Sequence, residues 1–166
     1  MQKIILLVTL PMLWACTPAI PSGTWPTVEL GSRKIEVSYR QGTGEPHSAG
    51  ELEDEIDRVL LAYMQAFPRA RCRWADAVKG WRFAFVRGPL FDPREIHELR
   101  YLQRAEGALM SGATLPPLGL TFVAYNRKLS VTSLKHELGH IIIGRCFGLW
   151  DEASFLALRD AHGLPR

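Results

Sequence analysis

The chain has 166 residues, of which 47% are hydrophobic, and its formal net charge is +3 at pH 7. Its basic residues are spread along the sequence and form no patch interleaved with aromatic residues, so the composition argues against a nucleic-acid-binding protein. The length suits one domain that buries a core without extra cross-links, and we expect a monomer.

The first fifteen residues have the pattern of a signal peptide. A positive segment at residues 1–3 precedes an apolar stretch at residues 4–14, which is too short to span a bilayer and contains a proline. The run Leu13-Trp14-Ala15-Cys16 resembles a bacterial lipobox. We therefore expect residues 1–15 to be removed and Cys16 to be lipidated. An ordinary signal peptide cleaved elsewhere and a short N-terminal anchor are the alternatives.

The segment after the lipobox is expected to be a tether. Residues 16–27 are rich in proline and small polar residues, a composition that favours an extended linker over a packed element. Thr17 directly after the cysteine resembles the outer-membrane sorting pattern of Gram-negative lipoproteins. We thus expect a lipoprotein of the cell envelope, anchored in the membrane and facing the periplasm, with its globular domain at residues 28–166.

Alternating and helical patterns predict an α+β fold for this domain. Apolar residues alternate with polar ones at residues 33–39 and 81–86, which predicts two strands, and residues 118–125 predict a third. Ser48 and Glu51 form a capping box before an amphipathic helix that extends to about Phe67. Asp92 and Pro93 predict the start of another helix, which ends near Gly107 or Gly112.

The strongest chemical signal is the motif His136-Glu137-Leu138-Gly139-His140. Helix positions i and i+4 lie on one face, one turn apart, so the two imidazoles can bind one Zn²⁺. Glu137 lies beside the first ligand and can take a proton from an attacking water molecule. The alternative is a buried helix whose histidines are satisfied by hydrogen bonds.

A zinc site of this kind needs a third protein ligand, and Glu152 is the best candidate. Gly148 is suited to end the motif helix in the left-handed conformation, and Asp151 is suited to cap a second helix. Glu152 then lies in the first turn of that helix, facing back toward the motif. The alternative is a surface charge that the helix dipole stabilises.

The motif followed by Trp150-Asp151-Glu152-Ala153 resembles the gluzincin clan of zinc metallopeptidases over roughly residues 115–160. The resemblance implies a small zincin-like domain with a short mixed or antiparallel sheet, and Glu152 as the third zinc ligand on the helix after the motif. It also implies that an edge strand before the motif helix, with Val123-Ala124-Tyr125, pairs with an extended peptide substrate. An ordinary core strand is the alternative for that segment.

Two features depart from thermolysin-like members of that clan. The gap between His140 and Glu152 is shorter, and Leu156 stands where those enzymes have an aspartate that orients a zinc histidine. Other residues must therefore orient the histidines. A metzincin register would place the third ligand at Cys146, but the glycine expected three residues earlier is Ile143.

The remaining cysteines, Cys72 and Cys146, are an even pair once Cys16 is lipidated. In the oxidising periplasm they are candidates for a disulfide, with two separate buried thiols as the alternative.

These observations predict a membrane-tethered zinc hydrolase, a metallopeptidase that acts on a peptide or protein with Glu137 as the general base. Tyr125, Arg145 and His162 are the candidates for stabilising the oxyanion. A non-catalytic envelope lipoprotein with a structural zinc site is the competing interpretation. A peptidase-like regulator that cleaves a single partner is a third.

Overall fold

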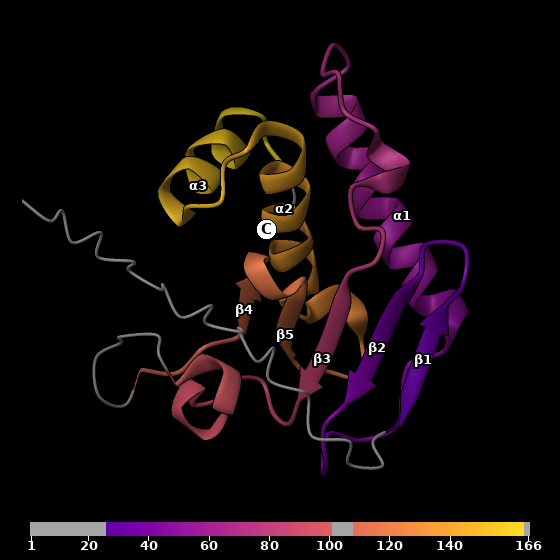
Figure 1. The fold of residues 1–166 in the computed structure, drawn as a ribbon, viewed down its shortest axis with the longest axis vertical. Helices are drawn as coiled ribbons and strands as arrows, with labels where there is room; N and C mark the ends of the chain where they lie inside the picture. The colour runs from indigo at the N-terminus through magenta and orange to yellow at the C-terminus, as the bar shows by residue number, and fades with distance from the viewer. Residues whose placement is uncertain (1–25, 101–107, 165–166) are drawn as a thin grey trace, which may run out of the picture.

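The computed structural model describes residues 26–100 and 108–164, and the remaining residues are drawn in grey in Figure 1. The expected signal peptide, Cys16 and nearly all of the tether lie outside the described residues. The described chain forms an α+β domain with a five-stranded mixed sheet in the order β1-β2-β3-β5-β4. Within these residues, no helix is both long and apolar enough to cross a membrane.

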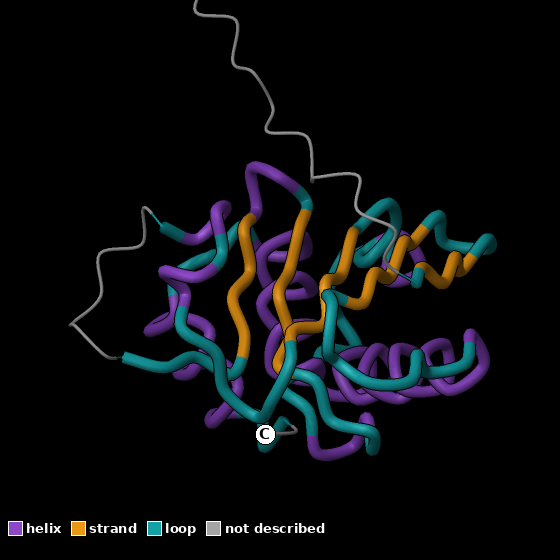
Figure 2. The backbone as a smooth tube through the Cα atoms, turned by 90° about the horizontal axis from the view of Figure 1, so that it is seen from below, coloured by secondary structure: helices purple, strands orange, loops and turns teal. Residues whose placement is uncertain are grey.

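The five strands lie side by side, with β4 at one edge and β1 at the other (Figures 1 and 2). The β1–β2 and β4–β5 pairs are antiparallel, whereas the β2–β3 and β3–β5 pairs are parallel. The strands are β1 at Thr27–Leu30, β2 at Ile35–Tyr39, β3 at Arg82–Val86, β4 at Gly112–Leu115 and β5 at Leu120–Ala124. The sequence predicts β2, β3 and β5 but misses β1 and β4, because four residues give too few alternations to stand out.

Three α-helices are present in the described residues: α1 at Ala49–Ala66, α2 at Leu134–Phe147 and α3 at Glu152–Ala161. The expected capping box of α1 is confirmed, since Ser48 Oγ accepts a hydrogen bond from Glu51 N while Glu51 Oε2 accepts one from Ser48 N. Gly148 ends α2 at a φ of 75°, in the left-handed region that favours glycine. Helix α1 provides the crossover between the parallel strands β2 and β3.

The expectation that the strand before the motif helix lies at the edge of the sheet is wrong. Strand β5, which contains Val123 and Ala124, pairs with β3 on one side and with β4 on the other, and all of its residues are buried. The edge strand is β4, which comes earlier in the chain. A local apolar run cannot show this, because the position of a strand in a sheet depends on which segments pair with it.

The prediction of a helix that begins at Asp92 is also wrong over the described residues. Asp92 does cap a backbone N–H, that of Arg94, but only two short 3-10 turns follow, Pro93–Glu95 and His97–Leu99. Ile96 interrupts them in an extended conformation and is buried. The predicted continuation through residues 101–107 lies outside the described residues.

The core has two parts, one on each face of the sheet. On one face, Phe83, Phe85 and Val123 pack with apolar residues of all three helices. On the other face, Ala84, Phe122 and Ala124 pack with a smaller group from residues 91–99 and β4, which includes Phe91, Ile96, Leu99, Ala113 and Leu115. The helical face therefore holds α2 against the strands, and this places the motif beside the edge strand β4.

Candidate metal centre

Helix α2 carries the motif, and close packing fixes its position. Its residues from Glu137 to Gly144 are all buried. Gly139 allows α1 and α3 to approach, because a Cβ there would lie 2.3 Å from Tyr63 Oη and 2.7 Å from a carbon of the Phe155 ring. Gly144 does the same for Trp150, which lies over it and stacks on Trp81. The position of the motif is therefore set by contacts with side chains from several parts of the chain.

The side chains of His136, His140 and Glu152 come together in the structure. His140 Nε2 lies 2.8 Å from Glu152 Oε2 and 3.2 Å from His136 Nε2, and His136 Nε2 lies 3.6 Å from Glu152 Oε1. Ligands about 2.0–2.1 Å from a tetrahedral metal ion are about 3.3 Å from one another. One ligand atom from each residue is within 4.8 Å of the others, so the three could hold a metal ion.

The turn between α2 and α3 delivers the carboxylate to the histidines. The side chain of Asp151 accepts a hydrogen bond from Ser154 N at 2.8 Å and caps α3. Glu152 is then the first residue of α3, and its carboxylate reaches back to α2 while its side chain stays half exposed. The carboxylate of Asp151 is therefore used to cap α3, whereas that of Glu152 is available to the candidate metal site.

The environment of the two histidines favours their neutral form. Phe155 packs against both rings, with centroid distances of 5.0 Å to His136 and 4.1 Å to His140. Burial lowers the pKa of both imidazoles, although the nearby Glu152 carboxylate acts in the opposite direction. A neutral imidazole has the free lone pair that a metal ligand needs. Leu156 cannot orient a histidine by a hydrogen bond, since it has no carboxylate. The packing of Phe155 restricts the orientation of both rings instead.

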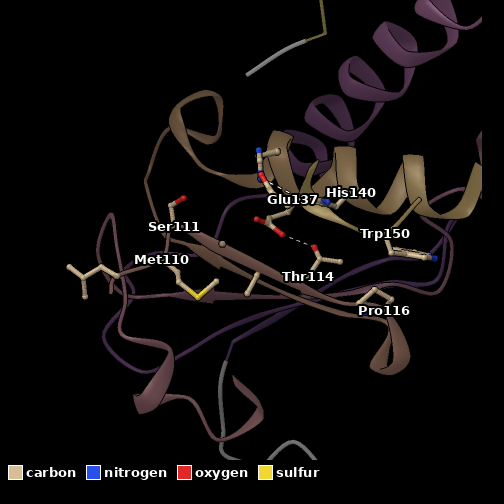
Figure 3. A pocket seen from close by; sticks show the side chains of 12 residues that line it. Met110, Ser111, Thr114, Pro116, Glu137, His140 and Trp150 are labelled. Carbon is tan, nitrogen blue, oxygen red and sulfur yellow. Dashed lines mark hydrogen bonds and ion pairs between the residues drawn. The ribbon is translucent and has the colours of Figure 1, made fainter. Parts of the chain in front are cut away.

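Glu137 lies on the same helix but points toward strand β4. It is only 4% exposed, and its Oε2 accepts a hydrogen bond of 2.6 Å from Thr114 Oγ1 (Figure 3). The backbone of Gly112 lies against the other carboxylate oxygen, since a Cβ there would be 2.4 Å from Oε1. The carboxylate is therefore held between the motif helix and the edge strand, and not among the three ligand atoms.

A cavity of about 490 Å³ adjoins this cluster. Figure 3 shows the labelled residues of its lining, with Glu137 and His140 on one side and Thr114 on the other. The lining is Leu109, Met110, Ser111, Gly112, Ala113, Thr114, Pro116, His136, Glu137, His140, Trp150 and Glu152. The four site residues expected from the sequence, His136, Glu137, His140 and Glu152, thus line the same open cavity as residues of strand β4.

The edge of β4 faces away from the rest of the sheet. Ala124 N donates to Ser111 O at 2.8 Å, and the register pairs Gly112 with Val123 and Thr114 with Thr121. By the alternation of antiparallel pairs, the backbone groups of Gly112 and Thr114 point outward from β5. Just before them, Met110 exchanges two backbone hydrogen bonds with Phe91. Within the described residues, no strand pairs with the outer edge of β4 from Gly112 onward.

The structure does not bring the expected oxyanion residues to the cavity. Tyr125 donates its hydroxyl to the carbonyl of Glu45, and the guanidinium of Arg145 donates to the carbonyls of Asp76 and Lys79. The ring of His162 packs on Phe67 at the C-terminal end of α3, with a centroid distance of 4.4 Å. None of the three lines the cavity.

Cys72 and Cys146 form a disulfide, with their Cα atoms 5.2 Å apart. It joins the last turn of α2 to the loop after α1. A sulfur in a disulfide cannot be a thiolate ligand, so the register with Cys146 as the third ligand is wrong in this structure. The disulfide thus helps to fix the position of the motif helix, and neither cysteine belongs to the candidate metal site.

Sequence reasoning missed Gly112, Thr114 and Trp150 at this site. For strand β4 the local signal was the short run Ala113-Thr114-Leu115 between Gly112 and two prolines, which is consistent with a strand but too brief to prefer one. Comparison of the chain with known protein families, with curated proteins and with solved structures finds no match.

Proposed function

We propose that the protein is a zinc-dependent hydrolase of the zincin type, and that its substrate is a peptide or protein. One observation carries the proposal: two imidazole nitrogens and a carboxylate oxygen converge beside a buried glutamate at the wall of an open cavity. Two histidines and one glutamate are a ligand set of catalytic zinc sites, in which the fourth position remains open. The contacts of the two imidazole nitrogens with each other and with the two carboxylate oxygens of Glu152, between 2.8 and 3.6 Å, are compatible with a zinc site and support zinc as the metal.

The proposed reaction divides the work between the metal and the protein. Zinc, when bound, polarises the scissile carbonyl and makes water more acidic. Glu137 is the general base: its carboxylate accepts the proton of the attacking water and passes it to the nitrogen of the leaving amine. Its burial between α2 and β4 limits its movement, which favours one orientation of the carboxylate.

The outer edge of β4 is the proposed binding site for the peptide backbone. Gly112 and Thr114 each direct one N–H and one C=O outward, beside the cavity that contains Glu137. An extended peptide can add to such an edge through main-chain hydrogen bonds. This role, which the resemblance to gluzincins placed on residues 123–125, is therefore proposed for β4. Main-chain hydrogen bonds do not depend on the side chains of the substrate. This binding mode therefore predicts an extended peptide as the class of substrate but does not predict its amino-acid sequence.

We propose that the enzyme is a lipoprotein of the cell envelope, tethered through Cys16. The support is the N-terminal sequence, with its signal-like residues 1–15 before the cysteine. The disulfide between Cys72 and Cys146 agrees with an oxidising compartment.

The test uses purified residues 17–166, with zinc measured by elemental analysis and cleavage measured on a broad peptide library. We expect about one zinc per chain and cleavage that Glu137→Gln abolishes. Zinc without cleavage would favour the non-catalytic lipoprotein with a structural metal. Absence of zinc after loading would reject the metal site itself.

A further inference from the structure

A series of hydrogen-bonded polar side chains, in which Thr114 is half-buried and the others are buried, leads from the sheet to Glu137. The indole Nε1 of Trp81 donates to Thr121 Oγ1 at 2.8 Å, and Thr121 Oγ1 lies 3.0 Å from Thr114 Oγ1. Thr114 Oγ1 in turn donates to Glu137 Oε2 at 2.6 Å. Trp81 and Thr121 are at most 2% exposed. This series of hydrogen bonds runs from Trp81, the residue before β3, through Thr121 on β5 and Thr114 on β4 to the motif helix.

The residues at the two ends of this series, Trp81 and Glu137, determine which group donates in each hydrogen bond. An indole N–H can only donate, so the oxygen of Thr121 accepts from Trp81 and the Thr121 proton is available for Thr114. An ionised carboxylate can only accept, so Thr114 uses its single proton for Glu137. Each hydroxyl thus accepts from one neighbour and donates to the next. The final contact is short, as expected for an O–H bonded to a charged oxygen.

We propose that Thr114 is a positioning residue for Glu137, and that Trp81 and Thr121 orient its hydroxyl toward the carboxylate. The proposal rests on the proposed function for the role of Glu137 as a base. Its consequence is geometric. The backbone of Thr114 belongs to the edge proposed to bind the peptide, while its side chain holds the base. The scissile bond and the base are therefore both positioned by the same residue.

Gly112 supports the same arrangement from the other side. Its missing side chain leaves room for the Glu137 carboxylate, since a Cβ would lie 2.4 Å from Oε1 and 2.7 Å from Cδ. Gly112 and Thr114 thus contact the two oxygens of the Glu137 carboxylate from the same strand and together fix its position. A purely structural role for the threonines would satisfy buried polar groups equally well, so the test must separate positioning from stability.

The first measurement compares Thr114→Val with Thr114→Ser in the zinc-loaded protein. Valine keeps the shape and removes the hydroxyl, whereas serine keeps the hydroxyl. Thr43→Val is the control, because Thr43 is a buried threonine whose hydroxyl donates to the carbonyl of Arg40 and which does not line the cavity. We expect Thr114→Val to keep its zinc and its KM but to lose about ten- to a hundredfold in kcat, the range for a hydrogen bond to a charged group.

Thr114→Ser should restore most of kcat, and Thr43→Val should match the wild type. Equal kcat in Thr114→Val and the wild type would overturn the proposal, as would an equal loss in the serine and valine variants. If Thr114→Val does not fold, the comparison of Thr121→Val with Thr121→Ser tests the preceding hydrogen bond of the series from Trp81 to Glu137. We expect a smaller loss of kcat in Thr121→Val than in Thr114→Val.

The second measurement needs no activity. A double-mutant cycle of Thr114→Val and Glu137→Ala, followed by denaturant unfolding of the metal-free protein, reports whether the two side chains interact. We expect a coupling of about tenfold or more in the unfolding equilibrium constant. Coupling below about twofold would reject the hydrogen bond. If the wild type binds zinc but cleaves no peptide, the proposed function fails while this cycle still decides whether Thr114 holds Glu137.

Discussion

His140 Nε2 and Glu152 Oε2 lie 2.8 Å apart although they belong to two successive helices. The turn between α2 and α3 makes this contact, with Gly148 in the left-handed conformation and Asp151 as the cap of α3. The motif helix supplies two of the proposed ligand atoms from one face, and the turn sets the position of the third. Metal binding should therefore depend on Glu152 as much as on the histidines.

Glu152→Gln and Glu137→Gln should have opposite consequences for zinc. At position 152 the amide lacks the negative charge of a ligand, so zinc affinity should fall by at least tenfold. At position 137 zinc should stay bound while turnover falls by two or more orders of magnitude, because the amide cannot accept a proton. Asp160→Asn, on the exposed face of α3, is the control. Zinc titration and peptide cleavage measure both effects, and full zinc occupancy in Glu152→Gln would exclude Glu152 as a ligand.

Gly139→Ala should disturb the site through packing alone. The added methyl group would meet Tyr63 Oη at 2.3 Å and displace Phe155, whose ring packs on both histidines. Overpacking of this kind costs about 1–3 kcal/mol of stability, and we expect weaker zinc binding with it. Gly50→Ala in α1 is the matched control, since nothing lies within 4 Å of its added Cβ. Thermal unfolding and zinc titration are the measurements; equal effects of the two substitutions would contradict the packing argument.

Removal of the disulfide should destabilise the domain. Cys72 and Cys146 are 74 residues apart in the chain, a separation for which the chain-entropy model gives about 4 kcal/mol. The double variant Cys72→Ala and Cys146→Ala should therefore melt about 10 °C lower than the oxidised wild type. Calorimetry with and without reductant tests this. Two thiols that titrate in the unfolded, non-reduced protein would show that the bridge does not form.

His47 should make the domain less stable in mild acid. Burial lowers the pKa of His47, whose ring nitrogens contact the Tyr39 hydroxyl and the carbonyl of Asn126, while the nearby charges of Glu51 and Arg127 act in opposite directions. Below pH about 6.5 the unfolded chain binds a proton that the folded state binds less well, so the unfolding free energy falls as the pH falls.

The corresponding experiment compares denaturant unfolding of the wild type and of His47→Gln between pH 7 and pH 5. The variant should be less sensitive to pH, by no more than about 1.4 kcal/mol per pH unit, the limit for one proton. Parallel pH profiles of the two proteins would contradict this assignment to His47.

Cys16→Ser should abolish lipidation in cells. Cys16 is the cysteine that ends the apolar segment, and Cys72 and Cys146 are joined to each other. Metabolic labelling with a fatty-acid analogue should mark the wild type and leave the Cys16→Ser variant unlabelled. Equal labelling of both would show that the lipid is attached elsewhere or that the label is unspecific.

The sequence by itself determined the features that depend on neighbours in the chain. The spacing of His136 and His140, the capping box at Ser48 and Glu51 and the cap at Asp151 are local patterns, and the structure has all of them. The alternation in β2 and β3 was also readable, because it reflects which side of each strand is buried. The fold class follows from these elements.

Tertiary structure decided which segments meet. Strand β4 is the edge and β5 is internal because β5 pairs with β3, and no pattern within β5 reports that pairing. The helix expected from Asp92 gave way to 3-10 turns, since burial of Ile96 and Leu99 against the sheet outweighs a local start signal. Glu137 meets Thr114, although 23 residues separate them, through the packing of α2 on β4. Contacts between segments far apart in the sequence therefore placed Glu137 beside the edge strand, and no local pattern could show this.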